Sequence, residues 1–147
     1  MRALLSLRLE KNFPTWYREL RPIYGPFEAA LDRFVDLTKN DFVGRDAAMR
    51  EKEGGGTLRR VSMIVDADDA DVLGDEPIWH DGKVVGWVTS GGYAHYVDKS
   101  LAQGYVPRAL AADIDNGAFE IEIIGDRRKA TIIPEPLFDP QGKRMRM

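Results

Sequence analysis

The sequence predicts an α+β protein in which a short helical and strand lead-in precedes a C-terminal antiparallel β-barrel, with Greek-key-like connections and about six strands. A hairpin is the first observation behind this prediction. Asp81-Gly82 lies between two runs rich in Val and Trp, and both central positions of a type I′ turn need a positive φ. The second observation is a set of further β-branched runs separated by Gly, Asp and Pro, which lie at 58–65, 100–106, 118–124 and 129–133.

Glycines punctuate the strands around this hairpin. A Gly-rich crossing at residues 89–92 is expected to separate the second hairpin strand from the strand that begins at Ser100. The glycines do not match the G-x-G-x-x-G fingerprint that opens a helix in dinucleotide-binding folds. We therefore interpret them as bends and bulges where strands curve around a small barrel; they are Gly86, Gly91, Gly92 and Gly104.

The composition is that of a globular protein. The chain has 147 residues, of which 44% are hydrophobic and 31% charged, so it is long enough to bury a core. Its net charge of −3 gives no electrostatic footprint for nucleic acid, and we expect no DNA or RNA partner. No apolar run approaches the roughly 20 residues of a membrane helix, and no signal peptide is recognisable. We expect a cytoplasmic protein with no membrane partner.

Three units are expected along the chain. Residues 1–53 form the lead-in, 57–140 the barrel and 141–147 a tail, with Gly54-Gly55-Gly56 as the joint between the first two. Residues 1–11 have the mixed apolar pattern of a helix, which Pro14 ends because proline disfavours helix at the residue before it. No capping residue precedes this helix, which suggests a piece of something longer.

The rest of the lead-in is irregular. Residues 15–25 combine aromatics and arginines and suit either the lining of a cleft or an ordinary loop that covers the core. Pro26 is expected to start a short helix through Leu31, and residues 34–37 alternate like a strand. Asp41 is a plausible N-cap for a helix that runs roughly from Phe42 or Gly44 to Lys52.

Several kinds of chemistry are excluded or unsupported. The chain has no cysteine, which excludes disulfides, thiolate metal sites and cysteine nucleophiles. Residues 66–76 are acidic, but Ala70 and Asp71 stand where a calcium loop needs an acid or Asn and then Gly. The two histidines lack a second ligand at metal spacing, so no metal is expected. Ser90, His95 and Asp98 lie too close in sequence for a catalytic triad and lack a G-x-S-x-G elbow.

Glu10 differs from the other charged residues because it follows an apolar segment and precedes the aromatic loop. A carboxylate in such a setting accepts two hydrogen bonds well from an aminopyrimidine-type ring. Periodicity alone also fits an ordinary surface charge at a helix end. Both interpretations stay open at the level of the pattern.

The order of several motifs resembles the folate-binding aminomethyltransferase family, which includes the glycine cleavage T-protein and the C-terminal halves of dimethylglycine and sarcosine dehydrogenases. The match covers nearly the whole chain, and the residues at 10–19, 89–95 and 136–143 resemble the dehydrogenase branch more than the T-protein. The motifs that carry the resemblance are LRLEK at 7–11, PFEAAL at 26–31, KNDFVGR at 39–45, GWVTSGG at 86–92, KSLA at 99–102 and YVP at 105–107.

This resemblance implies a set of binding residues. Glu10 matches the family glutamate that binds the pterin ring of tetrahydrofolate. Trp16 falls where the T-protein has a tyrosine, which implies a stacking or lining role. Lys39 falls near an arginine position for folate and keeps the charge without the bidentate fork. Tyr17 replaces the usual glycine, which would narrow the cleft.

The resemblance also implies that the catalytic residues lie elsewhere. The family's catalytic aspartate, most of the folate pocket and the FAD-binding domain of the dehydrogenases are upstream of anything that matches Met1. We therefore expect a C-terminal part of a one-carbon enzyme, with tetrahydrofolate as its small-molecule cofactor and an N-terminal folate and flavin portion as its partner, in cis or as a separate chain. The alternatives are an aminomethyltransferase that works with a lipoyl carrier and a non-catalytic docking or regulatory barrel.

Overall fold

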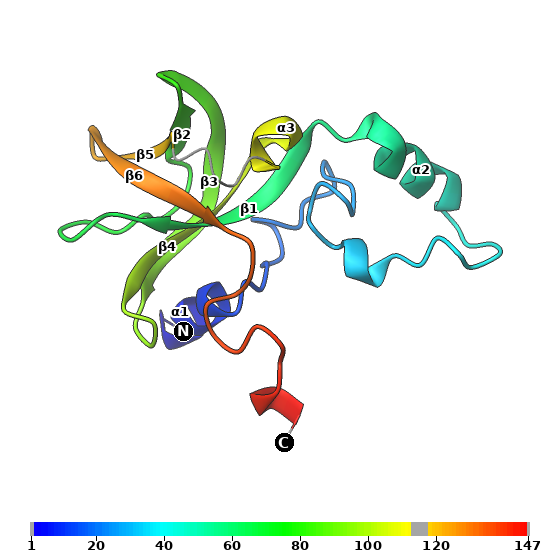
Figure 1. Ribbon diagram of the computed structural model, residues 1–147, viewed down its shortest axis with the longest axis horizontal. Helices are drawn as coiled ribbons and strands as arrows, with labels where there is room; N and C mark the ends of the chain where they lie inside the picture. The colour runs from blue at the N-terminus through cyan, green and yellow to red at the C-terminus, as the bar shows by residue number, and fades with distance from the viewer. Residues whose placement is uncertain (1, 113–117, 147) are drawn as a thin grey trace.

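The computed structural model describes residues 2–112 and 118–146, and in it six antiparallel strands close into a barrel beside a helical lead-in (Figure 1). The strand order around the barrel is β1-β4-β3-β2-β5-β6, and β1 also pairs with β6. Since β2, β3 and β4 are joined as successive hairpins while β1 and β5 lie at the two sides of this meander, the connections form Greek keys. The predicted fold class is confirmed. The strands are β1 (Leu58–Val65), β2 (Pro77–His80), β3 (Lys83–Ala94), β4 (Lys99–Pro107), β5 (Phe119–Ile123) and β6 (Asp126–Ile133).

Alternation of apolar and polar residues fills the barrel interior. In β5, Phe119, Ile121 and Ile123 are buried while Glu120 and Glu122 between them are partly exposed. Successive side chains of a strand point to opposite faces, so one face of each strand supplies the core. Each fully buried large aliphatic side chain contributes about 1.5–3 kcal/mol. The core comprises Val61, Met63, Val65, Val72, Ile78, Val88, Ala102, Val106, Phe119, Ile121, Ile123, Ala130 and Ile132.

The predicted hairpin is present between β2 and β3. Asp81 has φ 49° and Gly82 has φ 74°, the two positive values that a type I′ turn requires. The expected Gly-rich crossing at 89–92 is wrong, because β3 continues through it to Ala94 with only a shift in register against β4 between Val88 and Ser90. Gly91 instead lets β3 pack closely against Val72, since a Cβ at Gly91 would lie 2.7 Å from the Val72 side chain.

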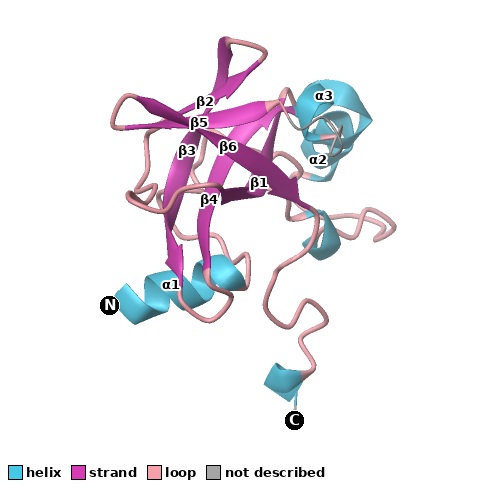
Figure 2. Ribbon diagram, turned by 60° about the vertical axis from the view of Figure 1, so that its left-hand side comes forward, coloured by secondary structure: helices cyan, strands magenta, loops and turns pink. Residues whose placement is uncertain are grey.

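The lead-in begins with α1 (Arg2–Glu10), which confirms the first predicted helix. Figure 2 shows this helix lying across one end of the barrel. The expected helix at 26–31 is reduced to turns, with Ala30 at φ 58°. The expected strand at 34–37 is wrong: a 3₁₀ turn, η1 (Asp32–Phe34), comes first, and the barrel is closed, so it offers no free edge to pair with.

A helical segment made of α2 (Arg45–Arg50) and η2 (Glu51–Gly55), called the excursion below, connects the rest of the lead-in to the barrel. α2 starts one residue after the later of the two expected starts, and its N-cap is Gly44 at φ 90°, not Asp41. It continues into the π-helical turn η2. Gly54 ends the helix with φ 142°, as the triple glycine predicted. Two short elements complete the described chain: α3 (Arg108–Ala111) and η3 (Arg144–Arg146). No helix in the described ranges is long and apolar enough to span a membrane.

Candidate functional site

Glu10 is the last residue of α1 and is almost completely buried, with 1% of its surface exposed. Its Oε1 accepts a hydrogen bond of 2.8 Å from the backbone N–H of Tyr96, in the turn after β3. Its Oε2 is also buried and has no hydrogen-bond partner within the described part of the chain. A buried oxygen without a donor is costly, and such a group in a native structure calls for an explanation.

Glu10 is one of the residues that line a hollow of about 340 Å³. One wall is a single face of α1, since Ala3, Ser6, Leu7 and Glu10 recur at helical spacing. The other wall is the turn after β3, where Ser6 Oγ accepts the backbone N–H of His95 at 3.2 Å and donates to the Tyr93 carbonyl at 3.0 Å. The lining residues are Ala3, Ser6, Leu7, Glu10, His95 and Tyr96. The hollow is partly apolar, and the residue with the unpartnered buried oxygen is among those that line it.

The other two predicted binding residues do not line this hollow. Trp16 is 70% exposed, and its ring meets the ring of Tyr17 edge-on at 6.0 Å. Lys39 is exposed in the segment before α2, where its backbone carbonyl accepts a hydrogen bond from Arg45 Nε at 3.2 Å. Of the three residues, Glu10 lines one of the two hollows described here, and Trp16 and Lys39 line neither. The roles of Trp16 and Lys39 stay predictions.

Sequence reasoning missed a buried carboxylate at Glu19. Its Oε2 accepts hydrogen bonds from the Thr15 N–H at 2.7 Å and from Arg8 Nη1 at 3.2 Å, and its Oε1 accepts from Thr89 Oγ1 at 2.6 Å and from Ser90 Oγ. Burial pushes the pKa of Glu19 up, but the hydroxyl donors, the Thr15 N–H and the Arg8 charge together hold the pKa below its ordinary value. Glu19 is therefore an ionised structural anchor.

The contacts of Glu19 extend into a polar cluster between the lead-in and the barrel. Gln103 of β4 accepts from Arg8 and from Arg60, each at 3.3 Å, and donates to Asn12 Oδ1 at 3.1 Å. Asn12 Oδ1 also accepts from Arg60 at 2.8 Å and from Ser62 at 2.7 Å. A pairing of Arg8 with Glu19 across a proline-containing loop leaves no periodic signal in the sequence, so only the folded chain shows it.

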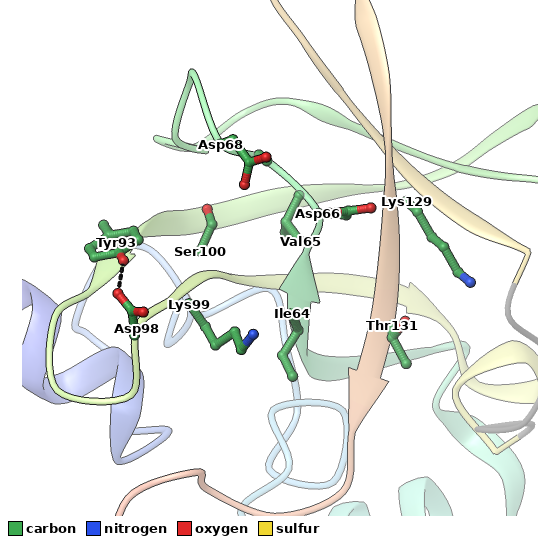
Figure 3. Close-up of a pocket in the computed structure, with 11 residues that line it drawn as sticks. Ile64, Val65, Asp66, Asp68, Tyr93, Asp98, Lys99, Ser100, Lys129 and Thr131 are labelled. Carbon is green, nitrogen blue, oxygen red and sulfur yellow. Dashed lines mark hydrogen bonds between the residues drawn. The ribbon is translucent and has the colours of Figure 1, made fainter.

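A second hollow, of about 330 Å³, is lined by the end of β1, the residues on both sides of the turn between β3 and β4, and the middle of β6 (Figure 3). Tyr93 and Asp98 point toward one another there and share a hydrogen bond. The side chains of Asp66, Asp68, Lys99 and Lys129 bring both signs of charge to its rim. None of the buried polar atoms without a partner in the described ranges belongs to its lining residues. The Glu10 hollow is thus the better candidate site.

The histidines and Ser90 take separate roles. His80 is buried against Phe119, with its Nδ1 3.4 Å from Asp81, whereas His95 is exposed at the Glu10 hollow. Ser90 Oγ donates to Glu19, so it is not arranged as a nucleophile beside His95. Within residues 2–112 and 118–146, no group of three or more acidic or histidine side chains is placed to hold a metal ion.

Comparison with known protein families gives one match, to the glycine cleavage T-protein C-terminal barrel domain, over residues 59–139. The mitochondrial dimethylglycine dehydrogenase of Mus musculus is 43% identical over 146 residues, which cover 99% of this chain and 17% of that protein. The mitochondrial sarcosine dehydrogenase of the same organism is 32% identical over 151 residues, with coverage of 99% and 16%.

A solved structure agrees with these sequence matches. The crystal structure of glycine cleavage system aminomethyltransferase T from Bartonella henselae superposes with a TM-score of 0.82 at 26% identity, over 94% of this chain and 38% of that one. This chain spans about one sixth of the length of the two dehydrogenases and 38% of the transferase. Both dehydrogenases are named as mitochondrial, so the expected cytoplasmic location gains no support from them.

Proposed function

Because the chain belongs to the family of glycine cleavage T-protein C-terminal barrel domains, as its motifs predicted, we propose that it forms the C-terminal folate-binding portion of a tetrahydrofolate-dependent one-carbon enzyme resembling dimethylglycine or sarcosine dehydrogenase. One observation carries the proposal. Glu10 Oε2 is buried beside a hollow without a hydrogen-bond partner among the described residues. A ligand with N–H donors would satisfy it.

The chemistry of Glu10 fits a reduced pterin. An ionised carboxylate only accepts hydrogen bonds, and the aminopyrimidine edge of a pterin presents neighbouring N–H donors. Oε1 already accepts the Tyr96 N–H, so Oε2 is the oxygen left without a donor among the described residues. Since Glu10 is only 1% exposed, a ligand that reaches Oε2 must shift a side chain that lines the hollow.

The proposed division of the chain follows from this site. Residues 1–53 would belong to a folate-binding domain and supply Glu10, while the barrel at 57–140 would brace it. Trp16 and Lys39 would contribute only when a further portion encloses the ligand, because both are exposed and lie away from the Glu10 hollow. That portion, in cis or as a separate chain, would complete the site and would carry FAD in a dehydrogenase.

In the complete enzyme, the flavin portion would oxidise an N-methyl amine, and tetrahydrofolate would capture the released one-carbon unit. The residues of this chain would bind and orient the pterin through Glu10 and form one wall of the pocket. None of them is proposed to carry out the oxidation, and we expect no turnover from this chain alone.

Calorimetric titration of the chain with tetrahydrofolate tests the role of Glu10. We expect the isosteric Glu10→Gln variant to bind at least about tenfold more weakly, because a hydrogen bond to a charged group contributes roughly 1.5–3 kcal/mol. Glu120→Gln is the matched control, since Glu120 is 41% exposed on β5, and it should bind like the wild type. Equal affinities of wild type and Glu10→Gln would refute the proposed contact.

A second candidate is a docking or regulatory barrel without affinity for folate. The near-complete burial of Glu10 favours it, because this carboxylate is covered in the present structure. The same titration separates the two functions. Heat of binding in the wild type supports the folate role, whereas no heat in the wild type or in either variant supports the docking role.

A further inference from the structure

We propose that the segment 138–144, named here the C-terminal clasp, positions the carboxylate of Glu10 and is thus a working part of the site. The inference rests on the proposed folate role of Glu10. Figure 1 shows the chain leaving β6 and passing the end of α1 on its way to the C-terminus. The clasp lies beyond the last barrel strand, so its contacts are not needed to close the barrel.

The first half of the clasp holds the end of α1. The backbone N–H of Phe138 donates to the carbonyl of Glu10 itself, at 3.1 Å. Lys11, the next residue, forms an ion pair with Asp139 at 3.2 Å and also donates to the Asp139 carbonyl. The Lys11 and Asp139 side chains are only 11% and 7% exposed, so this ion pair is better shielded from solvent than an ordinary surface pair.

The second half of the clasp holds Tyr96. The Phe138 ring meets the Tyr96 ring nearly perpendicularly, with centroids 4.8 Å apart, a favourable edge-to-face geometry. Arg144 lies over the Phe138 ring at 5.4 Å and donates to the Tyr96 hydroxyl at 3.2 Å. The Asp139 carboxylate accepts the Lys143 N–H at 2.8 Å, which folds the clasp back on itself.

These contacts converge on one hydrogen bond. Among the described residues, the Glu10 side chain has a single polar contact, the Tyr96 N–H to Oε1. The clasp grips the backbone at Glu10 on one side of this bond and the Tyr96 side chain on the other. Because Oε1 is fixed, the direction of the free Oε2 is fixed as well. Phe138 and Asp139 are therefore positioning residues that act through Tyr96 and Lys11.

The test uses two readouts on the same variants. The first needs no ligand: the amide proton shift and hydrogen exchange of Tyr96 in ¹⁵N NMR spectra report its bond to Glu10. The second is the affinity for tetrahydrofolate. We expect Phe138→Ala and Asp139→Asn to move the Tyr96 proton upfield, speed its exchange and weaken binding by roughly tenfold. Phe138→Tyr keeps the aromatic edge and should restore both readouts.

Gln141→Ala is the matched control, because Gln141 is exposed within the clasp and should leave both readouts unchanged. NMR spectra of each variant also establish that the barrel remains folded. If the Tyr96 amide of Phe138→Ala and Asp139→Asn is identical to that of the wild type, the clasp does not position Glu10.

The two hypotheses fail differently. If the wild type binds tetrahydrofolate and the clasp variants bind it equally well, the clasp inference is overturned and the folate role survives. If the wild type does not bind tetrahydrofolate but Phe138→Ala still shifts the Tyr96 amide, the folate role fails while the clasp is shown to hold Glu10.

Discussion

At the residue scale, two buried glutamates differ in how many of their carboxylate oxygens have a hydrogen-bond donor. Glu19 is fully buried, and both of its carboxylate oxygens have donors, including the Arg8 guanidinium. Glu10 is equally buried but has a donor on one oxygen only. A saturated carboxylate stabilises the fold, whereas an unsaturated one keeps an acceptor for something else. This contrast is consistent with a structural role for Glu19 and supports the proposal that Glu10 binds a ligand.

Replacing Glu19 should cost far more stability than replacing an exposed glutamate. Glu19→Gln leaves the buried Arg8 without its counter-charge, and we expect a loss of about 3–5 kcal/mol in the free energy of unfolding. Because the folded pKa of Glu19 lies below its usual value, the stabilisation is present above the unfolded pKa and is lost as pH falls through the folded pKa. The advantage over Glu19→Gln should therefore shrink in acid.

Urea unfolding monitored by circular dichroism at pH 7 and at steps below pH 4.5 measures both effects. Glu120→Gln serves as control, because the side chains of Glu120 and Arg127 are each 41% exposed and lie 3.9 Å apart. This variant should lower the free energy of unfolding by no more than about 0.5 kcal/mol. A Glu19→Gln variant as stable as Glu120→Gln would show that the network is not stabilising.

At the element scale, carboxylates hold the excursion at α2 and η2 against the rest of the lead-in. Glu51 Oε1 accepts the backbone N–H groups of Phe27 and Glu28 at 2.9 and 2.8 Å. Glu28 Oε1 in turn accepts the N–H groups of Thr57 and Leu58 at the start of β1. Gly25 packs closely against Glu51, because a Cβ on Gly25 would overlap the Glu51 carboxylate.

Removing the Glu51 carboxylate should loosen the α2 segment without unfolding the barrel. Glu51→Ala abolishes two charge-assisted hydrogen bonds, each contributing roughly 1.5–3 kcal/mol, so local opening should rise at least about tenfold. Limited trypsin digestion followed by mass spectrometry should show faster cleavage after Arg45, Arg50 and Lys52. Glu53→Ala, at an exposed neighbouring position, is expected to match the wild type. Equal cleavage of all three proteins would show that the Glu51 hydrogen bonds do not hold the α2 segment.

At the scale of the whole molecule, lead-in and barrel share one buried polar cluster. Asn12 and Arg8 come from the lead-in, whereas Arg60, Ser62 and Gln103 come from β1 and β4. Arg60 Nε also donates to the Ala29 carbonyl at 2.9 Å. Separating the lead-in from the barrel would break these hydrogen bonds and leave several of the polar groups without their protein partners. We therefore expect that residues 54–56 do not act as a flexible link between independently folding bodies.

Lead-in and barrel should unfold together. Far-ultraviolet circular dichroism reports mainly the strands and helices, and the amide signals of Ser6 and Ile121 in NMR spectra report α1 and β5 separately. We expect their urea midpoints to coincide, since the cluster couples the two parts. Gln103→Ala should lower all midpoints in parallel. Loss of the Ser6 signal at a clearly lower urea concentration than Ile121 would contradict this coupling.

Local patterns by themselves determined much of the barrel. β1 occupies the residues predicted for it, and the Asp81-Gly82 turn has the expected backbone because Asp and Gly both tolerate the positive φ that a type I′ turn needs. The lead-in was predicted less well, since a 3₁₀ turn and irregular backbone replace the expected strand, and the N-cap of α2 is Gly44 rather than Asp41. Its conformation depends on contacts such as those of Glu51 with distant backbone groups, which no local pattern contains.

For the candidate site too, the sequence determined one part and the tertiary structure the rest. The sequence alone singled out Glu10 as a candidate binding residue, because its apolar and aromatic neighbours and the motif that carries the family resemblance lie next to it along the chain. Only the tertiary structure decided that Glu10 is buried, that Tyr96 holds one oxygen, and that Phe138 and Asp139 reach this corner from the far end of the chain. Hydrogen bonds between residues more than eighty positions apart depend on how the barrel closes, and barrel closure is a property of the whole fold.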